Sequence, residues 1–180
     1  MTKRLRSSYP KFDIRFGWVV LLALLLQITV IYVGFGEAAV LRRFIFPSSY
    51  VLLVAFVIFN RRRIGFLVIG AGMLLNFAAI ISNGGLMPVT PANIEGAGMA
   101  YRLDGVELGD AVPRSKNVLL EESDTNLRWL SDRFTWLSDS PFSVFSVGDI
   151  VIAAGLVVVL GELLLLPALQ RGSPDGASPS

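Results

Sequence analysis

The stretch Asn60–Pro91 reads NRRRIGFLVIGAGMLLNFAAIISNGGLMPVTP, and it decides the class of this protein. Three arginines at 61–63 precede an apolar run at 64–82 that is long enough to cross a lipid bilayer as one helix. The run carries Asn76 in its interior and stops at Asn83-Gly84-Gly85. A basic cluster beside an apolar run indicates a membrane span whose arginine end stays in the cytoplasm.

The composition agrees with lipid as the solvent. Hydrophobic residues make up 53% of the 180-residue chain and charged residues 17%, and the mean hydropathy is +0.63. Average soluble domains are about a quarter charged. Cysteine and histidine are absent, which excludes disulfides, thiolate or imidazole metal sites and His-dependent catalytic triads. The same absence leads us to expect no metal and no cofactor. The net charge of +2 is small, so we expect no nucleic-acid partner.

Four apolar runs predict an all-α membrane protein with about four transmembrane helices. The second predicted span begins near Phe44 or Ile45, with Pro47 in its first turn. For the first apolar run, which follows the basic N-terminal residues, a cleaved signal peptide is the alternative interpretation. A basic leader at 1–16 precedes them, and a disordered Ser/Pro/Gly tail at 168–180 follows. The predicted spans are residues 17–35, 44–60, 64–82 and 148–167, the first three within 17–82.

The segment 83–147 differs from the rest of the chain because it holds nine acidic and five basic residues and no span-length apolar run. We expect it to form one long, partly helical loop on the extracytoplasmic side, with both termini in the cytoplasm. A short helix is predicted at Pro91–Ala100, and leucines at Asn117–Phe134 suggest a second amphipathic stretch. The aromatic residues Trp129, Trp136, Phe142 and Phe145 are typical of a membrane interface. Arg42 and Arg43 lie on the wrong side in this topology.

Polar residues inside spans are the first candidates for a functional site. Asn76 and Asn83 are seven residues apart and therefore share nearly one helix face. They would form a polar track that receives a lipid headgroup, a quinone or a small solute. The structural alternative, which we weigh more heavily, is a hydrogen bond from Asn76 to Gln27 that joins two spans.

Two carboxylates belong to the fourth span. Asp149 opens it, where a carboxylate caps free N–H groups and meets the positive end of the helix dipole. Glu162 lies near its other end and is either a proton or cation site or, more simply, a side chain that reaches the interface or pairs with the arginines at 61–63. Their separation of roughly 20 Å along a helix excludes a catalytic pair.

A rigid lip is predicted directly after the third span. Gly84 and Gly85 tolerate the left-handed backbone that ends a helix, and Met87 and Pro88 follow at the membrane edge. The sequence leaves open whether this lip folds back into the bundle.

Several short motifs together resemble a known family. They are Asn60-Arg61, Asn83-Gly84-Gly85-x-Met87-Pro88-Val89-x-Pro91, Leu127-Arg128-Trp129-Leu130-x-Asp132 and Phe145-Ser146-Val147-Gly148-Asp149. In these motifs the chain resembles, from about Trp18 to Leu166, a family of bacterial multi-span membrane proteins catalogued only as a domain of unknown function. The resemblance implies a bacterial plasma (inner) membrane and supports the four-span core, but it implies no activity or site residues.

Three functional hypotheses follow. The first is a non-enzymatic accessory or assembly subunit, with membrane lipid and other membrane proteins, or a second copy, as partners. The second is a small transporter or a quinone- or lipid-binding protein that uses Asn76, Asn83, Asp149 and Glu162. The third is an enzyme acting at the extracytoplasmic face through loop carboxylates such as Asp104, Glu121, Glu122 or Asp132, whose spacing singles out no pair.

Overall fold

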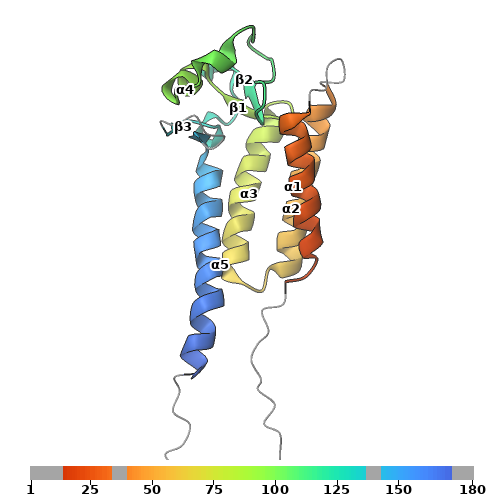
Figure 1. The fold of residues 1–180 in the computed structure, drawn as a ribbon, viewed down its shortest axis with the longest axis vertical. Helices are drawn as coiled ribbons and strands as arrows, with labels where there is room; N and C mark the ends of the chain where they lie inside the picture. Colours follow the sequence, from red (N-terminus) through yellow and green to blue (C-terminus); the bar gives the residue numbers. More distant parts are fainter. Residues whose placement is uncertain (1–13, 34–39, 137–142, 172–180) are drawn as a thin grey trace, which may run out of the picture.

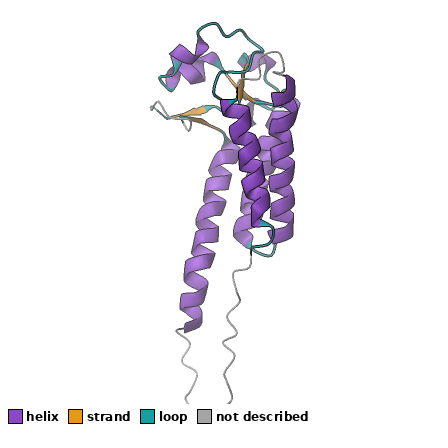
Figure 2. Cartoon of the chain, turned by 45° about the vertical axis from the view of Figure 1, so that its right-hand side comes forward, coloured by secondary structure: helices purple, strands orange, loops and turns teal. Residues whose placement is uncertain are grey.

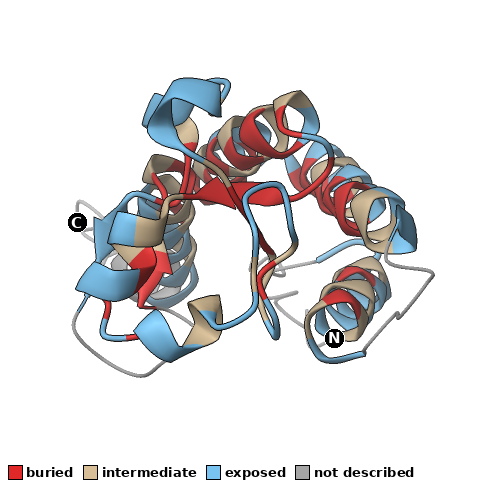
Figure 3. Cartoon of the chain, turned by 90° about the horizontal axis from the view of Figure 1, so that it is seen from above, coloured by how far each residue is buried: buried red, intermediate tan, exposed pale blue. Residues whose placement is uncertain are grey.

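The computed structural model describes residues 14–33, 40–136 and 143–171 (Figure 1). The predicted leader up to residue 13, Phe142 and the tail from residue 172 lie outside the described residues. Neighbouring helices pack in the order α1, α2, α3, α5, so that from above they form a curved row (Figure 3). The four long helices of the described ranges are α1 (Gly17–Tyr32), α2 (Arg42–Asn60), α3 (Ile64–Ser82) and α5 (Val147–Arg171).

The predicted fold class is confirmed, because the protein is mostly helical and α2, α3 and α5 are long and apolar enough to cross a membrane. The helix α1 is apolar but has only 16 residues and falls below that length. The helix α2 begins at Arg42, earlier than predicted, so Pro47 lies inside it instead of in its first turn. Proline there cannot donate to the carbonyl oxygen four residues earlier, that of Arg43.

Glycines let α3 and α5 approach each other closely. A Cβ added to Gly72 would lie 2.6 Å from the carbonyl oxygen of Gly148 and 2.8 Å from the amide nitrogen of Ile152. One added to Gly155 would lie 2.6 Å from the amide nitrogen of Ile69. Membrane helices associate through such contacts because lipid tails supply no hydrophobic drive between them. The small residues predicted to permit close packing therefore do so along α3.

A compact cap, which we define as residues 84–136 and 143–146, covers one end of the helices (Figures 1 and 2). β1 and β2 pair in parallel, and β3 and β4 pair antiparallel. Its apolar core includes Val89, Ile94, Val112 and Leu119. Its elements are β1 (Met87–Val89), α4 (Pro91–Gly96), η2 (Ala100–Leu103), β2 (Asn117–Leu119), η3 (Glu122–Asp124), η4 (Arg128–Leu130), β3 (Phe134–Thr135) and β4 (Val144–Phe145).

The two local predictions for the cap have different outcomes. The short helix predicted after Pro91 is confirmed as α4, whose N-cap Thr90 accepts a hydrogen bond from the amide of Asn93. The amphipathic stretch predicted at 117–134 forms no continuous element, because its residues form β2, η3 and η4. Leu119 is buried in a strand, and Leu127 adopts a left-handed backbone with φ of 51° that interrupts any helix.

The close α3–α5 contact predicts unequal effects of leucine at two glycines of α5. Gly155→Leu should lower the free energy of unfolding by about 2 kcal/mol, since the side chain would overlap the α3 backbone. Gly161→Leu should leave it nearly unchanged, because an added Cβ there meets nothing within 4 Å. Denaturation in mixed micelles checks this, and equal losses for both variants would contradict it.

Candidate functional site

The strand β1 carries the chain from α3 into the cap and positions the first residues of the site. Its partner β2 begins at Asn117, directly after Lys116. The amide of Met87 donates to the carbonyl oxygen of Lys116 at 3.1 Å, and the Asn117 side chain donates to the carbonyl oxygen of Met87 at 3.2 Å. The parallel register therefore fixes Lys116 immediately above the helices.

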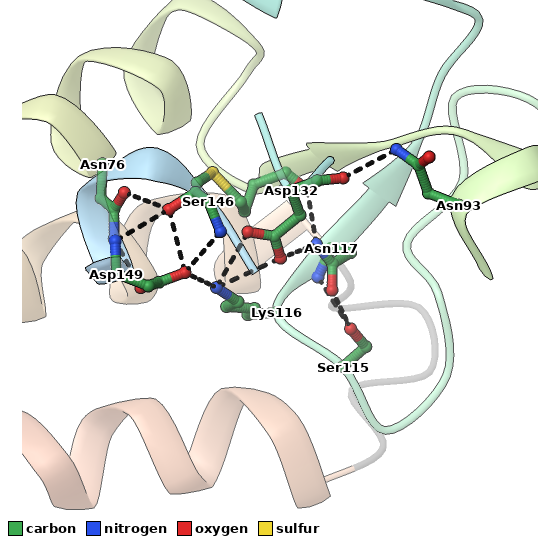
Figure 4. Close-up of polar contacts among 9 residues, drawn as sticks. Asn76, Asn93, Ser115, Lys116, Asn117, Asp132, Ser146 and Asp149 are labelled. Carbon is green, nitrogen blue, oxygen red and sulfur yellow. Dashed lines mark hydrogen bonds and ion pairs between the residues drawn. The ribbon is translucent and has the colours of Figure 1, made fainter. Parts of the chain in front are cut away.

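Asp132 joins this sheet from a distant part of the chain. Its amide donates to the carbonyl oxygen of Pro88 at 3.1 Å, and the residue is fully buried. The Asp132 carboxylate lies 3.2 Å from Nζ of Lys116 and accepts a 2.8 Å hydrogen bond from Nδ2 of Asn117 (Figure 4). A buried charge is thus paired and hydrogen-bonded, as burial requires.

Asp149 supplies the second carboxylate from the first turn of α5. Its Oδ2 accepts from the amide of Ser146 at 2.9 Å, while the amide of Asp149 donates to Oγ of Ser146 at 3.1 Å. This reciprocal arrangement is a capping box. The predicted capping role of Asp149 is therefore observed.

Asn76 of α3 completes the site from the bundle side. Its Nδ2 donates to Oδ1 of Asp149 at 2.8 Å, and its Oδ1 accepts from Ser146 at 2.7 Å. The hydrogen bond predicted between Asn76 and Gln27 is absent from the described part of the chain, since Gln27 donates to Ser49 instead. The curved row explains the difference, because α1 packs on α2 and α5 packs beside α3.

One lysine therefore lies between two carboxylates, and we call Asn76, Lys116, Asn117, Asp132, Ser146 and Asp149 the cap–bundle network. Nζ of Lys116 is 3.4 Å from Oδ2 of Asp149, so the cation joins the cap to α5 (Figure 4). Burial opposes the charge on Lys116, but Asp132 and Asp149 outweigh it and raise its pKa above the ordinary value. For the Asp132 carboxyl the effect of burial is the larger one, and it raises the pKa even though the Lys116 cation acts to lower it.

The chemistry of the network is that of a clamp. All four carboxylate oxygens of Asp132 and Asp149 accept hydrogen bonds or ion pairs from protein donors. The described residues contain no group of three or more acidic, histidine or cysteine side chains that would hold a metal ion. The network thus binds the cap to the spans and presents no unengaged carboxylate oxygen.

The family model that matches the chain covers residues 11–161, which include the whole cap–bundle network. The chain belongs to DUF5317, a family of unknown function. The resemblance inferred from the motifs is confirmed at the level of the family, and it brings no activity with it. Neither the curated proteins nor the solved structures searched contain a match to the chain.

In this DUF5317 protein the two asparagines predicted to form one track have separate partners. Asn83 is buried at the end of α3, where its Nδ2 donates to the carbonyl oxygen of Asn126 at 2.8 Å and its Oδ1 accepts from the amide of Asn126 at 2.9 Å. Asn76 instead faces α5. Asn83 therefore fastens the cap loop, and Asn76 belongs to the network.

The predicted lip is part of the cap interior. Gly84 and Gly85 have φ of 77° and 93°, and an added Cβ at Gly85 would collide with the backbone of Arg43. Met87 is fully buried, and Pro88 and Met87 pair with β2. The glycines are required both for their backbone conformation and for close contact with α2.

Arg42 and Arg43, which the charge rule placed on the wrong side, bind the cap. The Arg42 guanidinium donates to the carbonyl oxygen of Ser115 at 2.7 Å, and that of Arg43 donates to the carbonyl oxygens of Gly84 and Gly109 at 3.3 and 2.8 Å. Because these cations satisfy backbone acceptors of this chain, they hold α2 to the cap.

Glu162 contacts the backbone at the start of α3, directly after the arginines at 61–63. Its Oε1 accepts from the amide of Ile64 at 3.1 Å, at the first residue of α3, while its buried Oε2 has no hydrogen-bond partner among the described residues. A carboxylate at a helix N-terminus satisfies a free amide and interacts favourably with the helix dipole. Glu162 thus links the ends of α5 and α3 that lie away from the cap.

The sequence prediction missed Lys116, Asn117 and Ser146. The Ser146-x-x-Asp149 spacing is itself a capping-box pattern and could have identified Ser146. Lys116 is the only lysine after residue 11, which is a weaker signal. Its pairing with Asp132 depends on a long-range strand contact that periodicity does not reveal.

Removing the shared cation should destabilise the protein. Lys116→Met should lower the free energy of unfolding by about 3 kcal/mol, because it leaves buried Asp132 without its counter-charge. The control Arg128→Met removes the exposed pair with Glu122 and should cost about 1 kcal/mol or less. Equal costs, measured by denaturation in mixed micelles, would contradict a buried clamp.

The raised pKa of Lys116 predicts how the effect of the Lys116→Met substitution varies with pH. Since the pKa of Lys116 is raised on folding, its stabilising effect is complete below the unfolded value of about 10.4 and is lost only as pH rises through the folded value. The difference in unfolding free energy between wild type and Lys116→Met should therefore be constant from about pH 7.5 to 9.5. A difference that shrinks across this range would show that Lys116 loses its proton there.

Proposed function

We propose that this protein is a non-enzymatic accessory or assembly subunit of a larger complex in the bacterial inner membrane. The cap faces the extracytoplasmic side and both termini face the cytoplasm. The basic turn at 61–63 supports this orientation because it lies at the end opposite the cap (Figure 1). The engagement of every Asp132 and Asp149 oxygen within the chain supports a structural role over catalysis.

The observation that carries the proposal is the one-sided packing of α5. Only 11% of its span is buried, against 44% for α2 and α3, because α3 is the long helix of the described ranges against which it mainly packs. Val157 and Leu164 are 70% and 68% exposed. Gly161 also has open space beside it, and a small residue allows another helix to approach closely. A helix of another membrane protein is the partner that fits this face.

Gly161→Leu tests the proposal without disturbing the isolated fold. Photocrosslinking residues at Val157 and Leu164 should join the protein to one defined membrane protein, recovered in stoichiometric amount from mild detergent. Gly161→Leu should abolish that recovery while leaving the unfolding midpoint unchanged. A crosslinker at Leu21 of α1, which is 69% exposed, is the matched control and should reach lipid.

Three results would refute the subunit proposal. They are crosslinks from α5 to lipid alone, recovery of a homo-oligomer without another protein, and recovery that Gly161→Leu does not change. The first would favour a protein that works through lipid or a small ligand, which is the second of the hypotheses from the sequence.

A further inference from the structure

The end of the molecule opposite the cap carries a basic cavity. It has a volume of about 290 Å³, and it opens between the start of α1 and the end of α2. Three arginines from two separate segments contribute to it, together with two apolar residues. Its lining consists of Arg15, Ile58, Phe59, Arg61 and Arg62.

A buried asparagine brings these segments together. Oδ1 of Asn60 accepts from the amide of Arg15 at 2.9 Å, and Nδ2 of Asn60 donates to the carbonyl oxygen of Arg15 at 3.0 Å. Asn60 is only 6% exposed, and it also donates to the carbonyl oxygen of Phe56 in its own helix. Asn60 is 45 residues further along the chain than Arg15, and this contact fixes the backbone of Arg15 beside Arg61 and Arg62.

The charges at this cavity are not neutralised within the described ranges. No described carboxylate forms an ion pair with Arg15, Arg61 or Arg62, and all three residues are exposed. Glu162, the acidic residue that contacts this end of α3, accepts a hydrogen bond from the amide of Ile64. Guanidinium groups present a planar set of donors that matches the oxygens of a phosphate group.

The other walls of the cavity are apolar and face outward. Ile58 and Phe59 are 55% and 51% exposed, and the Phe59 ring packs against Phe16 with 4.9 Å between ring centroids. These residues lie at the ends of α2 and α1, beside the hydrocarbon that surrounds the spans. A ligand that fills this site would have an anionic group for the arginines and hydrocarbon for the aromatic wall.

We propose that this cavity binds the phosphate of an anionic phospholipid, with the acyl chains lying against Ile58 and Phe59. A soluble phosphate compound would satisfy the arginines but would make no contact with the apolar wall. If the basic residues served only to orient the protein in the membrane, they would need only to lie near a span. That role would not require Asn60 to hold Arg15 beside Arg61 and Arg62. Basic pockets at the ends of membrane helices bind lipid headgroups in this manner.

Native mass spectrometry of the full chain released from detergent tests the proposal. Dioleoyl phosphatidylglycerol should bind at least about tenfold more tightly than phosphatidylcholine with the same acyl chains. Arg61→Gln/Arg62→Gln should remove that preference. The control Arg102→Gln/Arg114→Gln removes the same charge from the cap, and it should retain the preference. Arg61→Lys/Arg62→Lys keeps the charge but loses the paired donors, so it should bind more weakly than wild type.

Each alternative result would overturn the inference. Equal binding of the two lipids would exclude a phosphate-selective site. Equal losses in both glutamine variants, or full binding by the lysine variant, would show a general attraction to basic protein. Displacement of the lipid by an equal concentration of glycerol 3-phosphate would show that a soluble phosphate suffices. Circular dichroism and the unfolding midpoint confirm that each variant is folded.

Discussion

The structure depends on one cation shared by two carboxylates that belong to different parts of the fold. Asp132 comes from the cap and Asp149 from the first turn of α5, and Lys116 contacts both. A cation in a partly buried position stabilises such a pair only if the remaining polar atoms are also satisfied. Asn117 and Ser146 provide those hydrogen bonds, so the position of the cap follows from the position of α5.

The glycine contacts between α3 and α5 make this arrangement possible. Gly72 and Gly148 bring the two backbones together at the level where Asn76 meets Asp149. With larger residues the helices would separate, and Asn76 would lose the acceptor that its buried amide requires. Small residues along the spans and polar residues at their ends therefore form one continuous structural unit, and the capping box of α5 is part of it.

Hydropathy was sufficient to predict the apolar segments of this chain, because the bilayer imposes a length on any helix that crosses it. It was not sufficient for the cap, where β1 pairs with β2 thirty residues away and Asp132 joins β1 through Pro88. The leucines at 117–134 suggested an amphipathic stretch, but Leu119 is buried in a strand and Leu127 has a left-handed backbone, so the segment is divided among short elements. Charge counting could not reveal the partners of Arg42 and Arg43, since it cannot distinguish a free cation from one bound to backbone carbonyls.

The two ends of the molecule use charge in opposite ways. At the cap, carbonyl or carboxylate oxygens of the chain bind the side chains of Arg42, Arg43 and Lys116. These three cations therefore hold the cap in place. At the other end, Asn60 holds Arg15 beside Arg61 and Arg62, and the described residues supply them no anion. A set of guanidinium groups beside hydrocarbon is most stable where phosphate is abundant, which is the lipid headgroup layer. The same basic cavity would therefore both orient the protein and fix its depth in the bilayer.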